Sequence, residues 1–132
     1  MAHYFTRDEA EALLPRLEPL LVELQDLRAE LGEVEEQASA LQLKMRGNGH
    51  SRQGELAELR QRAATLIEAI NERVRRINEW GVLVKDFETG LVDFPSLRDD
   101  REIYLCWRLG EPHIAWWHTV EGGFAGRQPL AD

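Results

Sequence analysis

The sequence predicts an α+β protein in which a long N-terminal antiparallel helical hairpin, coiled-coil-like, packs on a C-terminal four-stranded antiparallel β-meander. Two observations predict it. Apolar residues recur every seven positions through the first half of the chain, and the period changes to two after Gly81. A chain of 132 residues suffices for one domain. We therefore expect a single domain over 1–132, with the hairpin at 6–80 and the meander with a glycine-rich tail at 81–132.

The first helix has a clear start and a regular apolar pattern. Thr6 and Glu9 have the spacing of a capping box, in which each side chain binds the main chain of the other residue. An a/d pattern of about five heptads follows, carried by Ala10, Leu13, Leu17, Leu20, Leu24, Leu27, Leu31, Val34, Ala38, Leu41 and Met45.

A second periodic stretch, from Leu56 to Trp80, follows a glycine-rich turn over Arg46–Gly54 and ends at Gly81. Two such helices joined by a short loop run antiparallel. One hairpin leaves much of its apolar surface exposed, so we expect a homodimer through the hairpin. The alternative is that the sheet covers, within one chain, the flanking residues Leu14, Leu21, Ile67 and Val74.

The meander is predicted from alternating residues and turn signals. Gly90 ends a three-residue loop at a left-handed position, and residues 95–100 form a connection. The expected strands are 82–86, 91–94, 102–109 and 113–119.

Alternation gives the predicted sheet an apolar face and a mixed face. The apolar face, to which His118 also belongs, carries Val82, Val84, Val92, Phe94, Ile103, Leu105, Trp107, Ile114 and Trp116. The mixed face carries Lys85, Asp93, Tyr104, Cys106, Arg108, His113, Ala115 and Trp117.

Composition excludes several classes of protein. The net charge of −8 disfavours binding to nucleic acid or anionic lipid, and the basic cluster Arg73, Arg75 and Arg76 is interpreted as a solvated helix face. No apolar run reaches the roughly 20 residues of a membrane span. The N-terminus lacks signal-peptide features, so a cytoplasmic protein is expected. Cys106 is the one cysteine, so we expect neither an intrachain disulfide nor a cysteine-based zinc site.

Several stretches of the chain resemble a known family. They are Tyr4–Ala10 with Leu13–Pro15, Gly90–Pro95, Tyr104–Glu111, the pair Trp117-His118, and Gly123–Arg127. These motifs resemble the domain of unknown function 2203 family, and the likeness covers nearly the whole chain. The resemblance implies an uncharacterised bacterial domain and no particular reaction.

The candidates for chemistry lie in the meander and the tail. Six residues could in principle donate to a metal ion, namely Asp93, Cys106, Glu111, His113, His118 and Glu121. No HExxH or CxxC motif occurs, and His118 and Glu121 are kept as weak metal candidates. Cys106 is interpreted as a small core residue rather than a nucleophile. A small anionic ligand is the stronger alternative, because arginines and a stacking wall could bind it. Its candidate residues are Tyr104, Arg108, Trp117, His118 and Arg127, unless Arg108 pairs with Asp93 or Glu111.

No motif names an enzymatic reaction or a cofactor. The leading expectation is a non-enzymatic homodimeric scaffold or adaptor that uses its helical hairpin. The alternative is a protein that binds a small anionic ligand or a metal through the mixed sheet face and the C-terminal tail.

Overall fold

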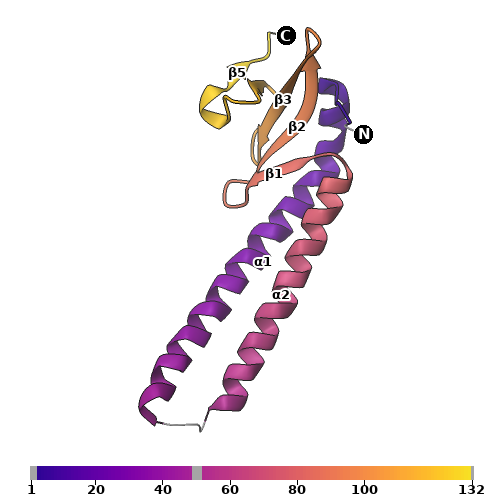
Figure 1. Ribbon diagram of the computed structural model, residues 1–132. Helices are drawn as coiled ribbons and strands as arrows, with labels where there is room; N and C mark the ends of the chain where they lie inside the picture. Colours follow the sequence, from indigo (N-terminus) through magenta and orange to yellow (C-terminus); the bar gives the residue numbers. More distant parts are fainter. Residues whose placement is uncertain (1–2, 49–51, 132) are drawn as a thin grey trace. The chain divides into compact units, whose positions relative to one another are not determined.

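The computed structural model describes residues 3–48 and 52–131, which form two helices and a five-stranded antiparallel sheet (Figure 1). The helices are α1 (Arg7–Asn48) and α2 (Gln53–Glu79), and the short 3₁₀ helix η1 is Phe124–Gly126. The strands lie in sequence order across the sheet: β1 (Leu83–Asp86), β2 (Leu91–Arg98), β3 (Arg101–Arg108), β4 (Trp116–Thr119) and β5 (Gln128–Pro129). The predicted α+β class is confirmed. The predicted number of strands, four, was too small by one.

The chain divides into two compact units, one of Met1–Glu23 with Val74–Asp132 and one of Leu24–Arg73. In the Leu24–Arg73 unit, Arg62 of α2 donates a hydrogen bond to Glu30 of α1 at 3.0 Å. Neither helix contains a stretch long and apolar enough to cross a membrane. Among the described residues of this unit, those that are buried all lie at positions of the predicted apolar pattern. They are Leu24, Val34, Leu41, Leu56, Leu66 and Ile70.

In the other unit, the start of α1 is fixed to one face of the sheet. The predicted capping box is confirmed, because Glu9 N donates to Thr6 Oγ1 at 3.1 Å and Thr6 N donates to Glu9 Oε1 at 2.8 Å. The Phe5 carbonyl accepts a hydrogen bond from the buried Ser96 hydroxyl at 2.6 Å. The Phe5 ring meets Phe94 edge-on, with 5.3 Å between centroids. This face of β2 is therefore covered, at Phe94 and Ser96, by the segment that leads into α1.

The connection predicted at 95–100 is wrong, because β2 continues through Pro95 to Arg98. The Pro95 carbonyl accepts from Phe5 N at 2.7 Å. The N and O of a strand residue point to the same side, so the missing N–H of Pro95 costs no bond to β3. The turn itself is only Asp99–Asp100, both left-handed with φ of 52° and 63°. The left-handed conformation predicted at Gly90 is confirmed by a φ of 69°.

The predicted faces of the last long strand are also wrong by one residue. The structure begins β4 at Trp116 rather than His113, and Ile114 is buried from an irregular segment. The alternation of the two sheet faces along the chain is therefore broken between Ile114 and β4. Directly opposed residues of an antiparallel pair share a face, and the observed pairs are Cys106 with Trp116, Leu105 with Trp117, and Tyr104 with His118. Trp116 and His118 thus share the face of Cys106, and Trp117 lies on the apolar face.

Candidate functional site

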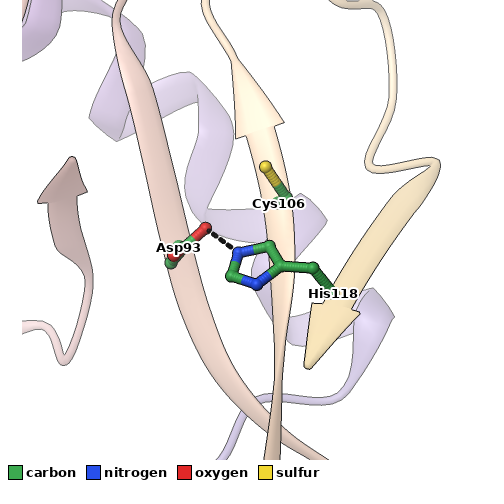
Figure 2. A group of neighbouring side chains, drawn as sticks. All are labelled: Asp93, Cys106 and His118. Carbon is green, nitrogen blue, oxygen red and sulfur yellow. Dashed lines mark hydrogen bonds and ion pairs between the residues drawn. The ribbon is translucent and has the colours of Figure 1, made fainter. Parts of the chain in front are cut away.

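Three buried side chains that can bind metal converge on the sheet face that points away from Phe5. Asp93, Cys106 and His118 come from β2, β3 and β4 (Figure 2), and their ligand atoms lie within 4.8 Å of one another. Their exposed fractions are 2%, 0% and 4%. Each of the three central strands thus contributes one donor to a site that is shielded from solvent.

The sheet register brings this cluster together. Asp93 and Cys106 are opposed across β2 and β3. His118 is opposed to Tyr104, and its ring reaches across β3 so that Nε2 lies 2.9 Å from Asp93 Oδ1. The other ring nitrogen, Nδ1, lies 2.7 Å from the main-chain oxygen of Thr119. Both ring nitrogens of His118 therefore have oxygen partners.

The two oxygen partners of His118 set a condition on the hydrogen atoms between them. A neutral imidazole carries one N–H and can donate to only one of two acceptors. The second contact requires a second proton on the ring, a proton on the Asp93 carboxyl group, or a metal ion between the two atoms. Histidines that bind metal through one nitrogen commonly donate the other N–H to a main-chain carbonyl. The contact of His118 with Thr119 has this form.

Cys106 does not have the surroundings of a nucleophile. Burial raises the pKa of its thiol to about 11, against the lowering effect of Arg127. A reactive cysteine needs a lowered pKa and a neighbouring base. The hydrogen-bond partners of the His118 ring are Asp93 and the main chain of Thr119, and not the Cys106 thiol. A bound metal ion, by contrast, would deprotonate the thiol.

An ion pair between Arg127 and Glu111 lies beside Cys106. Arg127 Nη2 donates to Glu111 Oε1 at 2.8 Å and to the main-chain oxygen of Cys106 at 3.3 Å. Burial would raise the pKa of Glu111, but hydrogen bonds from the Arg127 side chain and the Arg108 main chain outweigh it and lower that pKa. The pKa of Arg127 is raised although burial opposes the charge, because Glu111 is its hydrogen-bond partner. Both groups are therefore charged at neutral pH.

The residues predicted for an anion site are only partly brought together. Tyr104 lies beside His118, with ring centroids 5.4 Å apart, and Arg127 lies beside Cys106. Trp117 lies on the opposite face of the sheet, where the guanidinium carbon of Arg98 is 4.7 Å from its ring centroid.

The remaining predicted residues lie apart from the cluster. Arg108 is exposed, with its guanidinium carbon 5.8 Å from the ring centroid of Phe124. Its side chain was expected to pair with Asp93 or Glu111. The contact observed with Glu111 is instead made by the main chain, because the Glu111 carboxylate accepts the main-chain N–H of Arg108. Glu121 is exposed, lines a surface pocket with Trp117, and is not one of the three donors of the cluster. The sequence included Asp93 and Cys106 among the possible metal donors but placed His118 on the opposite face of the sheet, so it did not bring the three together. The pairing of Tyr104 with His118 puts His118 on their face instead.

Comparison with curated proteins and with solved structures finds no match. A family model described as an uncharacterized conserved protein matches residues 3–130, nearly the whole chain, and the matched range includes all three residues of the cluster. The chain belongs to this uncharacterized family, DUF2203.

Proposed function

We propose that this protein binds one divalent metal ion of the zinc class through Asp93, Cys106 and His118. The contacts of His118 carry the proposal. Its ring lies between two oxygen atoms at 2.7 and 2.9 Å. A neutral ring has one N–H and can donate to only one of them. A metal ion on Nε2 and Asp93 Oδ1 would satisfy the second contact and use the neutral form of the ring.

The donor types and their spacing support this proposal. A thiolate, an imidazole nitrogen and a carboxylate oxygen together suit zinc and similar borderline ions. Metal–ligand bonds of about 2.0–2.3 Å place tetrahedral ligand atoms roughly 3.3–3.8 Å apart. The ligand atoms here lie within 4.8 Å of one another, and the Asp93–His118 distance is 2.9 Å. Small side-chain adjustments would therefore complete the geometry.

The ligand set also bears on the type of site. Three protein ligands leave a tetrahedral ion with one position for water or a small molecule, as in open zinc sites. Burial of the cluster excludes bulk water and strengthens electrostatic interactions within it. We propose metal binding, and the free position is where any further chemistry would occur.

Metal content and cobalt spectroscopy test this proposal. Purified protein loaded with Zn²⁺ and desalted should retain one ion per chain, and Co²⁺ should give the charge-transfer absorption of a thiolate ligand. Cys106→Ala should abolish that absorption, and Asp93→Asn should weaken retention of the ion. His113→Gln is the matched control, because His113 is an exposed histidine outside the cluster. A wild-type protein that retains no metal, or retention unchanged in Cys106→Ala, would overturn the proposal.

As a second candidate, we propose that the helices form a homodimeric scaffold. Its support is the exposure of Leu43 and Ile67 in the Leu24–Arg73 unit, at 63% and 43%. Leu21, which the sequence suggested for the dimer contact, is already buried within the chain at 2%. Size-exclusion chromatography with light scattering tests this candidate, and a monomer at micromolar concentration would rule it out.

A further inference from the structure

We propose that residues 122–128 of the C-terminal tail form a latch over the metal site, held closed by the Arg127–Glu111 ion pair. Opening of this latch sets the rate at which the metal ion enters and leaves. The inference rests on the metal-binding function proposed above, and it concerns regulation of that same site.

The latch lies on the face of the sheet that carries the cluster. Arg127 donates to the main-chain oxygen of Cys106 at 3.3 Å, and its guanidinium carbon lies 5.0 Å from the ring centroid of Trp116. Trp116 is the residue opposed to Cys106 in the sheet. The Arg127 charge also acts on the Cys106 thiol. In Figure 1 the tail, in yellow, lies on the side of the sheet away from the start of α1.

Glu111 is a fixed anchor for Arg127. Its carboxylate accepts the main-chain N–H of Arg108, the last residue of β3, at 2.8 Å. Its main-chain oxygen accepts from the indole N–H of the buried Trp107 at 3.0 Å. The side chains of Arg127 and Glu111 are only 12% and 18% exposed. An ion pair so shielded is stronger than one in open solvent, where such pairs contribute little.

The tail is the part of this face that can open. Cys106 and His118 are held by the ladders between β2, β3 and β4. The tail has only the two-residue strand β5 and the turn η1, and it begins at adjacent glycines, with Gly123 at a positive φ of 61°. Segments with few main-chain bonds open at lower free energy than the core of a sheet. Loss of the anchor should therefore release the tail before it disturbs the cluster.

Glu111→Gln is the variant that tests the latch, because it keeps Arg127 and removes only the charge of its partner. Charge-assisted hydrogen bonds are about twice as strong as neutral ones. Two rates should rise about tenfold, which corresponds to about 1.4 kcal/mol. One is transfer of Zn²⁺ from the loaded protein to excess EDTA. The other is alkylation of Cys106 by iodoacetamide in the metal-free protein, which reports on one site because the chain has a single cysteine.

Two control variants separate latch opening from other effects. Arg98→Gln removes an arginine–tryptophan contact of 4.7 Å on the opposite face and should leave both rates unchanged. Thr6→Ala weakens the cap of α1 and lowers global stability without removing any described contact of residues 122–128. If alkylation proceeds through global unfolding, Thr6→Ala will speed it as much as Glu111→Gln does, and the latch is refuted.

The two readouts also separate this inference from the proposed function. Faster Zn²⁺ transfer and faster alkylation in Glu111→Gln alone would support the latch. Rates within twofold of the wild type in that variant would overturn it, even if the protein binds Zn²⁺. If no Zn²⁺ is retained, both the proposed metal-binding function and the proposed control of metal exchange are refuted. The alkylation rates then still decide whether the tail closes over Cys106.

Discussion

Cys106→Ala should remove the stabilisation that the protein gains from a metal ion while costing little in its absence. The Cys106 side chain is fully buried, at 0% exposed. Removing one buried heavy atom of this size costs about 1 kcal/mol through lost packing. A core residue and a metal ligand would lose the same amount in the metal-free protein, so that loss alone does not distinguish them.

The difference appears when metal is present. A ligand that binds only the folded state adds about 2.7 kcal/mol at a free concentration of 100 times its dissociation constant. For a chain of 132 residues, 1 kcal/mol shifts the melting temperature by about 4 °C. Zn²⁺ should therefore raise the melting temperature of the wild type by roughly 10 °C. It should leave that of Cys106→Ala unchanged, because the site then has two ligands.

Thermal unfolding followed by circular dichroism, with Zn²⁺ and with excess EDTA, measures both effects. The net charge of −8 makes weak surface binding of cations a real alternative. His113→Gln removes an exposed histidine and should keep the full increase. An equal increase in Cys106→Ala and the wild type would place the bound ions on the surface and refute the assignment of Cys106 as a ligand.

Three further variants test the fold around the site. The pKa of Glu111 is lowered from its ordinary value of 4.5. The stabilisation that its charge contributes is therefore complete above pH 4.5 and is lost as the pH falls through the folded-state pKa. The difference in unfolding free energy between the wild type and Glu111→Gln should thus be larger at pH 7 than at pH 3, and a constant difference would contradict this. Thr6→Ala should lower the free energy of unfolding by about 1 kcal/mol in urea titrations, and no loss would mean that the cap is not formed in solution. Gly90→Ala should cost about 2 kcal/mol or more, because φ is 69° and the new Cβ would lie 2.6 Å from that of Leu109. Its control, Gly32→Ala in α1, has open space and should stabilise by up to about 1 kcal/mol.

Features that depend on neighbouring residues were predictable from the sequence. The capping box at Thr6 needs one partner three residues away, and the left-handed glycines need no partner at all. Every buried residue of the described helices except Leu21 lies in the predicted apolar pattern, because helical periodicity is set within each segment. The short strand β5 escaped prediction, because its two residues, Gln128 and Pro129, contain no alternation.

The site depends on register, and register was predictable on one side of β3 only. Residues equally distant from a two-residue turn face each other, and Asp93 and Cys106 each lie six residues from the Asp99–Asp100 turn. Aspartate tolerates the left-handed conformation that such a turn requires, so this pair was accessible to sequence reasoning. The connection from β3 to β4 is irregular, and an irregular connection does not transmit alternation. Whether Trp117 or His118 faces the cluster is decided by the ladder of β3 and β4, which sequence alone does not determine. A shift of that ladder by one residue would put an indole where the imidazole lies and leave Asp93 without its partner.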